Sequence, residues 1–319
     1  MTLLDRQRGC LLGLAIGDAL GAAVEFSSPG TFRPVTGYRS GGLHGLGPGE
    51  WTDDTSMALA LAASLGNGEW DLNDQAQRYV NWHIQGDYSV NGRCFDIGFT
   101  TRRALWDFGQ NKNARTSGDS SSRASGNGSI MRLAPVPIRF AHLFPNQLDE
   151  LARLAAESSL PTHGSSQCLS ACRYMAVLLA GLLQGHDRDV VLQPDWEPLQ
   201  QLRAIEPLHP EVEEIASGSF WKKQPPEIKG SGYVVHSLEA ALWAFHQAPD
   251  FRTAVMNAVN LGDDADTTGA VCGQLAGARF GESGIPADLL EGLARRDMLE
   301  DALSGITGNS TGSTGNSTD

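Results

Sequence analysis

The stretch GCLLGLAIGDALG at residues 9–21 is the most informative part of the sequence for the fold. It is apolar over most of its length, and its glycines recur every four residues: Gly9, Gly13, Gly17 and Gly21. A second row has the same spacing: Gly269, Gly273 and Gly277. Glycine weakens a helix interior by roughly 1 kcal/mol relative to alanine, so a regular row indicates that another backbone approaches closely. We predict two central, tightly packed helices, whose matching rows make them candidates to pack against each other.

Helix-like spacing of apolar residues continues along the chain. It predicts helices over residues 9–26, 55–65, 72–85, 97–108, 148–158, 163–183, 234–246, 251–261, 267–280 and 287–303. Strand-like alternation is scarce, and no strand–helix–strand rhythm occurs. The sequence therefore predicts an all-α fold, with long functional loops at roughly 27–51, 109–128 and 218–232.

The length of 319 residues suits one large domain or two average ones. We predict a single compact domain over residues 1–304. Residues 305–319 repeat Gly, Asn, Ser and Thr, a composition that cannot bury a core. The sequence therefore predicts a low-complexity, disordered tail there.

Composition and charge limit the classes of partner. Hydrophobic residues make up 41% and charged residues 19%, which allows a large buried core, and the net charge is −13. A protein that grips nucleic acid through its phosphates needs positive charge, so we expect no nucleic-acid partner. A small anionic ligand stays compatible with this charge if bound cations reverse the local field.

Other features concern the compartment. The five cysteines are odd in number and scattered, which does not indicate a disulfide framework. Residues 6–24 resemble a signal peptide, but Asp18 interrupts the apolar run. No apolar stretch reaches the roughly 18–20 residues that span a bilayer. We therefore expect a cytoplasmic protein with no membrane partner.

Two acidic clusters open predicted helices. One is WTDDTSM at residues 51–57, and the other is GDDADTTG at residues 262–269. A single such motif is best explained by helix capping. Each cluster nevertheless holds more carboxylates and hydroxyls than a cap needs, and adjacent aspartates repel unless positive charge lies between them. Hard oxygen ligands suit Mg²⁺, Mn²⁺ or Ca²⁺, so two clusters joined in space would form a two-metal site.

A glycine-rich segment, GNGSIMR at residues 126–132, lies between the acidic clusters in the sequence. Its backbone amides suit a phosphate at a helix start. A plain turn is the more common explanation for such a segment by itself.

Together these motifs resemble the ADP-ribosylglycohydrolase family. The resemblance rests on residues 13–21 with Glu25, residues 51–55, residues 126–132, Thr162-His163 and residues 262–269, which occur in the family's order. It covers roughly residues 6–282. It implies a compact all-α fold with two Mg²⁺ or Mn²⁺ ions.

The resemblance also implies roles for individual residues. The implied metal ligands are Thr52, Asp53, Asp54, Asp264, Asp266 and Thr267. Glu25 matches the family's glutamate beside the metals, and either Glu25 or a metal-bridging aspartate, Asp54 or Asp264, is expected to orient or deprotonate the attacking water. The implied contacts to the diphosphate and distal ribose are Gly126, Asn127, Gly128, Ser129, Met131 and His163. Tyr233 resembles a residue near the adenosine end.

Residues 94–100, CFDIGFT, resemble the family's Asp-Val-Gly-Asn-Thr stretch. Asp96 matches the acidic residue near the acceptor in arginine-directed members, whereas Phe99 replaces the familiar asparagine. Because a carboxylate pairs well with a guanidinium, ADP-ribosyl-arginine is the favoured substrate. The alternative for Asp96 is a cap for the helix expected to begin near Ile97.

The implied activity is hydrolysis of the N-glycosidic bond in ADP-ribosylated protein side chains, with ADP-ribose as product. One alternative is an O-linked substrate, such as ADP-ribosyl-serine or O-acetyl-ADP-ribose. A second is a non-catalytic protein similar to the lens crystallins related to this family. All six implied ligands and Glu25 are present in the sequence, which favours an enzyme.

Overall fold

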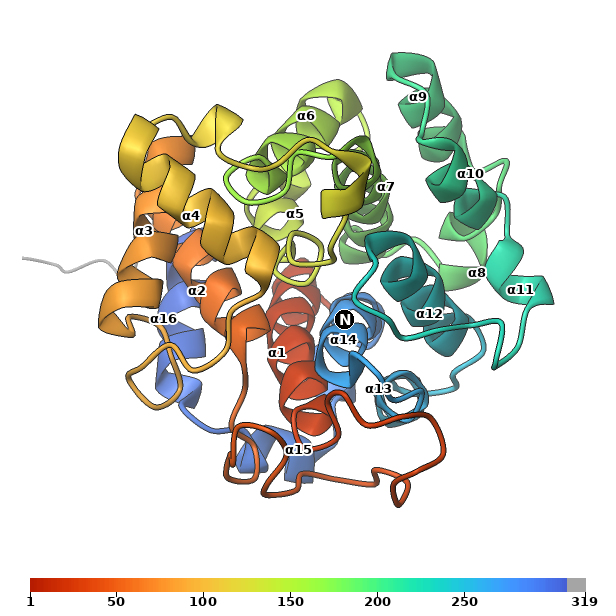
Figure 1. Cartoon of the computed structure of the whole chain (residues 1–319). Coiled ribbons are helices and arrows are strands. Elements are labelled where there is room, and N and C mark those ends of the chain that lie inside the picture. The colour runs from red at the N-terminus through yellow and green to blue at the C-terminus, as the bar shows by residue number, and fades with distance from the viewer. Residues whose placement is uncertain (309–319) are drawn as a thin grey trace, which may run out of the picture.

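The computed structural model describes residues 1–308, and this part of the chain forms α-helices and short 3₁₀ turns without a β-strand (Figure 1). The predicted all-α fold is therefore confirmed. The helices are α1 (Leu3–Gly21), α2 (Asp53–Gly66), α3 (Leu72–Gln85), α4 (Phe99–Asn111), α5 (Pro135–Arg139), α6 (Leu148–Ser159), α7 (Ser166–Leu183), α8 (Arg188–Val191), α9 (Glu197–Ile205), α10 (Pro210–Ala216), α11 (Ser219–Lys222), α12 (Val234–His246), α13 (Phe251–Val259), α14 (Ala265–Phe280), α15 (Ala287–Gly292) and α16 (Arg296–Thr307).

Helices α1 and α14 lie antiparallel at the centre of the molecule and pack through their glycine rows (Figure 1). The facing pairs are Gly9 with Gly277, Gly13 with Gly273, and Gly17 with Gly269. A Cβ added to any of these glycines would collide with the backbone of its partner. The predicted packing of the two rows is therefore confirmed. The end of α1 consequently meets the start of α14, where Gly21 lies against Asp266.

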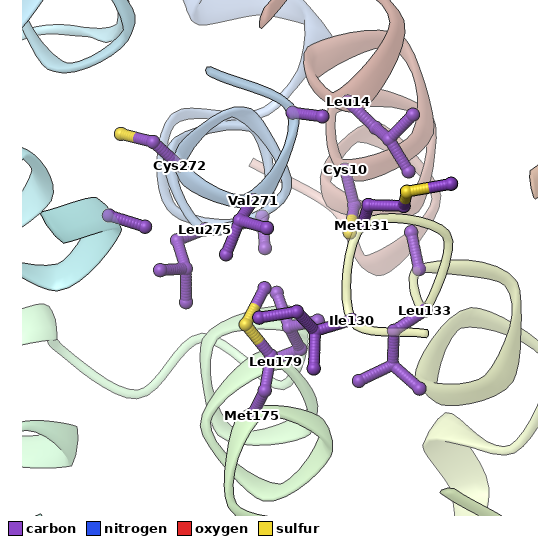
Figure 2. Close-up of a cluster of buried hydrophobic side chains, with 14 of the residues drawn as sticks. Cys10, Leu14, Ile130, Met131, Leu133, Met175, Leu179, Val271, Cys272 and Leu275 are labelled. Carbon is purple, nitrogen blue, oxygen red and sulfur yellow. The ribbon is translucent and has the colours of Figure 1, made fainter. Parts of the chain in front are cut away.

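The main hydrophobic core surrounds this helix pair. Figure 2 shows Met175 and Leu179 of α7 facing Leu275 of α14, with Ile130 beside them. Helix α7 is long and apolar enough to cross a membrane by length and composition, but 89% of it is buried inside the protein. The expectation that no apolar stretch reaches this length is wrong, and burial in the core accounts for the apolar character of α7.

Several helix bounds differ from the predictions. Helix α1 ends at Gly21, so Glu25 lies in the turn that follows it. Residues 163–165 precede α7, so His163 is outside the predicted helix. The helix predicted over residues 287–303 is divided into α15 and α16, because Arg295 adopts a left-handed backbone with φ of 43°. Helix α5 and helices α8 to α11 were not predicted.

The C-terminal boundary also differs. Helix α16 continues to Thr307 and buries Ile306. The tail predicted to begin at residue 305 therefore starts inside a helix. The remainder of that prediction, at residues 309–319, lies outside the described residues.

Candidate functional site

Asp18 of α1 fixes the start of α2. Its Oδ1 accepts hydrogen bonds from the backbone N–H and the hydroxyl of Thr52, both at 2.9 Å. Its Oδ2 accepts hydrogen bonds from the backbone N–H of Thr55 at 3.0 Å and from the Thr55 hydroxyl at 2.6 Å. Burial raises the pKa of Asp18 to about 6, although these donors oppose the shift. A buried carboxylate on the glycine-packed helix thus orients the first turn of α2.

The two acidic clusters meet at the starts of α2 and α14. The Thr52 hydroxyl lies 3.2 Å from Asp54 Oδ2 and 3.2 Å from Asp266 Oδ2. The Thr267 hydroxyl lies 3.4 Å from Asp54 Oδ2. Residues separated by 214 positions in the sequence therefore form one cluster.

Burial and mutual repulsion make it unfavourable for the carboxyl groups in this cluster to ionise. Burial, reinforced by neighbouring carboxylates, raises the pKa of Asp54 and Asp266 well above the ordinary value. The same causes raise the pKa of Glu25 to about 9. Asp54 Oδ1, Asp266 Oδ1 and Glu25 Oε2 are buried without a hydrogen-bond partner among the described residues. Such oxygens are destabilising unless something positive binds them.

The oxygen positions suit divalent cations. Asp18, Asp54 and Asp266 bring carboxylate oxygens within 4.8 Å of one another, and Glu25, Asp264 and Asp266 do the same. Hard cations such as Mg²⁺ and Mn²⁺ prefer oxygen donors of this kind. The residues present therefore fit a divalent metal.

A histidine lies between Glu25 and Asp96. His44 Nε2 is 3.3 Å from Glu25 Oε2 and 3.5 Å from Asp96 Oδ2. The His44 ring also packs against Phe95, with 5.3 Å between ring centroids. The sequence does not indicate a role for His44, because this residue lies in a loop without a motif. The only local signal was the glycine-rich sequence GGLHG at residues 41–45.

The loop around His44 is tightly built. Gly41 and Leu46 exchange two backbone hydrogen bonds of 2.8 and 3.1 Å, which closes a turn with His44 near its tip. Gly42 packs against the carbonyl oxygen of Ala22, where a Cβ would lie 2.6 Å away. The turn is thereby seated on the end of α1, beside Glu25.

The capping role considered for Asp96 is wrong. Helix α4 begins at Phe99, and its N-cap is Gly98, which makes no side-chain cap. The Asp96 carboxylate instead lies beside His44, as described above. Asp96 is therefore free to face the cleft.

The glycine loop at residues 126–128 forms another wall of the site. The Asn127 backbone N–H donates to Gly232 O at 3.1 Å, and Asn127 Nδ2 donates to Asp264 Oδ2 at 2.7 Å. A Cβ on Gly128 would lie 2.6 Å from His163 Cε1, so glycine permits close contact with the ring. Burial lowers the pKa of His163 to about 3, which keeps the ring neutral at physiological pH.

A cleft of about 230 Å³ opens over these groups. The predicted residues in its lining are Glu25, Asp53, Asp96, Gly126, Asn127, Gly128, Met131, His163, Asp264, Asp266 and Thr267. Phe26 and Phe99 also line it. Thr52 and Asp54 are fully buried outside this lining.

Two predicted substrate contacts have other surroundings. Ser129 is buried, and Cys172 Sγ lies 3.5 Å from its hydroxyl. The Tyr233 hydroxyl donates to Glu211 Oε2 at 2.7 Å, while the Tyr233 backbone pairs with Gly126 beside the cleft. Neither side chain is part of the cleft lining.

Comparison with known proteins identifies the family of this chain. The family described as ADP-ribosylglycohydrolase matches residues 1–314. The ADP-ribosylarginine hydrolase Tri1 of Pseudomonas putida (strain GB-1) is 41% identical over 292 residues, covering 91% of this chain and 75% of that protein. The ADP-ribosyl-[dinitrogen reductase] glycohydrolase of Rhodospirillum rubrum is 31% identical, covering 95% of this chain and 97% of that protein.

A solved structure extends the likeness to three dimensions. It is described as an ADP-ribosylglycohydrolase-related protein complex, and it aligns with a TM-score of 0.82 at 40% identity. The alignment covers 96% of this chain and 98% of that one. The chain described here therefore belongs to the ADP-ribosylglycohydrolase family.

Proposed function

We propose that the protein hydrolyses the N-glycosidic bond between ADP-ribose and an arginine side chain of a modified protein. The observation that carries this proposal is the position of Asp96, which lines the cleft together with Glu25 and the two acidic clusters. A carboxylate there suits a guanidinium leaving group. Relatives that are 41% and 38% identical carry the name ADP-ribosylarginine hydrolase, which supports the same acceptor.

We infer that two divalent cations, Mg²⁺ or Mn²⁺, belong to the site. The residues that would hold them are Thr52, Asp53, Asp54, Asp264, Asp266 and Thr267. The support is the set of buried carboxylate oxygens without partners. When bound, such cations supply positive charge that offsets the carboxylates, orients the ribose hydroxyls and polarises a water molecule.

Residues of the protein bind the substrate, activate the water and stabilise the charges that develop in the reaction. The backbone amides of Gly126 and Gly128 bind the diphosphate, while the Asn127 amide holds the loop to Gly232 and the neutral His163 ring supports it. Glu25 orients the attacking water and accepts its proton, because its carboxylate lines the cleft beside Asp264 and Asp266, where bound cations would favour its ionised form. Positive charge develops at the anomeric carbon as the bond breaks, and the Asp264 carboxylate stabilises it. Asp96 stays paired with the departing guanidinium group.

A substrate panel tests the proposal. It contains ADP-ribosyl-arginine, ADP-ribosyl-serine and O-acetyl-ADP-ribose, each assayed with chelator and with added Mg²⁺ or Mn²⁺. We expect the arginine conjugate to be hydrolysed fastest, with activity abolished by chelation and restored by metal. Faster turnover of an O-linked conjugate would overturn the acceptor, and full turnover in metal-free protein would overturn the metal requirement. Failure on all three would indicate a non-catalytic relative.

Two ligand variants sharpen the metal assignment. Asp54→Ala and Asp266→Ala should fold but lose bound metal and activity, because each removes one carboxylate from the cluster. Asp301→Ala, at an exposed position on α16, is the matched control and should keep both. Normal metal content and turnover in either cluster variant would contradict the assignment.

A further inference from the structure

Helix α4 presents an unusual outer face beside the cleft. Phe99 is 70% exposed and Trp106 is 66% exposed, although both are large apolar side chains. Arg102 and Arg103, which are also exposed, lie between them in the sequence. The spacing of three and four residues puts Phe99, Arg102, Arg103 and Trp106 on one side of the helix. We call these four residues the α4 face.

The opposite side of α4 anchors the helix to the protein. Thr101, Ala104, Leu105 and Phe108 are buried there. The Arg102 guanidinium lies 6.0 Å from the centroid of the Phe99 ring, within cation–π range. The α4 face is therefore held on a rigid element. Figure 1 shows α4 at the outside of the molecule, across the α1–α14 pair from α9, α10 and α11.

The α4 face is continuous with the catalytic cleft. Phe99 and Thr100 line the cleft and also line a neighbouring hollow of about 300 Å³. Arg103 and Arg123 contribute to the lining of this second hollow. The hollow thus joins the cleft to the edge of the α4 face at Phe99 and Arg103, while Arg102 and Trp106 lie outside both linings.

The charge of this region opposes that of the whole chain. Residues 99–123 contain five basic residues, which are Arg102, Arg103, Lys112, Arg115 and Arg123, and two acidic residues, which are Asp107 and Asp119. Five minus two gives this segment a net charge of +3, whereas the chain as a whole carries −13. Arg115 pairs with Glu157 at 2.9 Å and Arg103 lies 3.8 Å from Asp119, so the α4 face presents its positive charge mainly through Arg102. Exposed tryptophan, phenylalanine and arginine side chains are the types enriched at protein interfaces.

We propose that the α4 face docks the protein that carries the modified arginine, through a segment of apolar and acidic residues next to that arginine. This inference rests on the proposed function, because a protein-linked arginine in the cleft brings its own chain against the cleft rim. Phe99 to Trp106 spans seven helical steps, about 10 Å. An extended chain advances about 3.3 Å per residue, so a few residues beside the arginine reach across the face.

Peptide substrates test the docking. Two peptides each carry one ADP-ribosylated arginine with four residues on either side. The flanking residues are leucine and glutamate in one peptide and leucine and lysine in the other. Free ADP-ribosyl-arginine is the third substrate. We expect the wild-type kcat/KM to be about tenfold higher for the glutamate peptide than for the lysine peptide, with the preference shrinking as salt is added. Trp106→Ala should lower kcat/KM for the glutamate peptide about fivefold or more. Arg102→Glu should remove the preference, and both variants should hydrolyse free ADP-ribosyl-arginine as the wild type does.

Matched controls lie on helices away from α4. Ile205→Ala removes an exposed apolar side chain from α9, and Lys222→Glu reverses an exposed charge on α11. Both should behave as wild type on all three substrates. Equal losses on all substrates in the α4 variants would indicate a structural effect and overturn the docking proposal, as would an unchanged peptide preference. A dimer that Trp106→Ala dissociates would show that a second copy covers the face instead. Failure of the wild type on free ADP-ribosyl-arginine would overturn the proposed function itself.

Discussion

At the scale of single residues, Asp96 determines the predicted choice of acceptor. Asp96→Ala should lower hydrolysis of ADP-ribosyl-arginine on the order of 100-fold, because the guanidinium loses a charged partner. The affinity for free ADP-ribose should stay near wild type, since that product lacks the guanidinium. Asp96→Asn keeps the shape of the side chain and loses its charge, so its turnover should lie between that of Asp96→Ala and that of the wild type.

Three measurements on the Asp96 variants test this role. They are turnover of arginine-linked and serine-linked substrates, affinity for ADP-ribose, and melting temperature. Equal loss on both substrates would contradict a role in acceptor recognition. The melting temperature should not fall, because Gly98 rather than Asp96 caps α4 and the lost charge repels Glu25 and Asp53.

His44 should act through the two carboxylates that it separates. His44→Ala removes the ring between Glu25 and Asp96, so we expect kcat for ADP-ribosyl-arginine to fall about tenfold while ADP-ribose affinity is retained. His44→Gln keeps a polar N–H group near the two carboxylates and should recover part of the loss. His142→Ala, at an exposed histidine, is the control. If His44→Gln is as impaired as His44→Ala, the ring does not act as a donor to these carboxylates.

Asp18 and His44 belong to the site, but the sequence did not predict their roles. The acidic cluster was predictable because two similar acidic motifs each open a helix. Asp18 was visible only as a charge in an apolar run, and its four hydrogen bonds to Thr52 and Thr55 depend on how α1 meets α2. His44 depends on a loop seated on α1. Both roles arise from contacts between distant segments, which no local pattern encodes.

At the scale of elements, the glycine rows of α1 and α14 set the geometry of the site. Gly13→Ala should destabilise the protein by about 2 kcal/mol, because the new Cβ meets the backbone of Gly273, which cannot move aside like a side chain. Gly109→Ala in α4 is the matched control, since a Cβ there meets nothing within 4 Å. It should stabilise the protein by up to about 1 kcal/mol through helix propensity.

Chemical denaturation of both variants measures the difference between these two glycines. Replacement of glycine by alanine should thus lower the free energy of unfolding in α1 and raise it in α4. A stability gain in Gly13→Ala would mean that the α1–α14 contact is looser than the described packing.

The helices that the sequence did not reveal share a physical reason. Helices α5, α8, α9, α10 and α11 contain five, four, nine, seven and four residues. Such short segments offer too few turns for an apolar period to emerge. The long central helices were predictable, whereas the break between α15 and α16 depends on the backbone conformation of one residue, Arg295.

At the scale of the whole molecule, the acidic cluster makes stability depend on pH and metal. In the metal-free protein the pKa of Glu25 is raised to about 9, that of Asp18 to about 6, and those of Asp54 and Asp266 well above the ordinary value. In the unfolded chain these groups titrate near pH 4. The folded state therefore binds more protons than the unfolded state above pH 4, and stability falls as pH rises toward 9.

His163 works in the opposite direction at lower pH. Its folded pKa of about 3 lies below the unfolded value near 6.5, so its contribution is present above pH 6.5 and is lost as pH falls toward 3. Well above pH 6.5 this contribution is constant. Burial also raises the pKa of the Cys10, Cys168, Cys172 and Cys272 thiols, so they add to the loss of stability as pH approaches the unfolded thiol value near 8.5. The difference between metal-free and metal-bound protein from pH 6.5 to 9 therefore isolates the carboxylates of the acidic cluster, because the cation acts on these groups and not on the thiols.

Melting temperatures between pH 6.5 and 9, with chelator and with saturating Mg²⁺ or Mn²⁺, test this balance. With chelator the melting temperature should fall as pH rises, because burial opposes ionisation of the cluster. Bound cation favours the ionised carboxylates, so the stabilisation by metal should grow with pH. Asp54→Asn removes one repelling charge, so it should melt higher than wild type at pH 8 with chelator and gain little from added metal. A metal-free melting temperature that rises across this window, or a metal-induced gain that does not change with pH, would contradict the placement of the cations among these carboxylates.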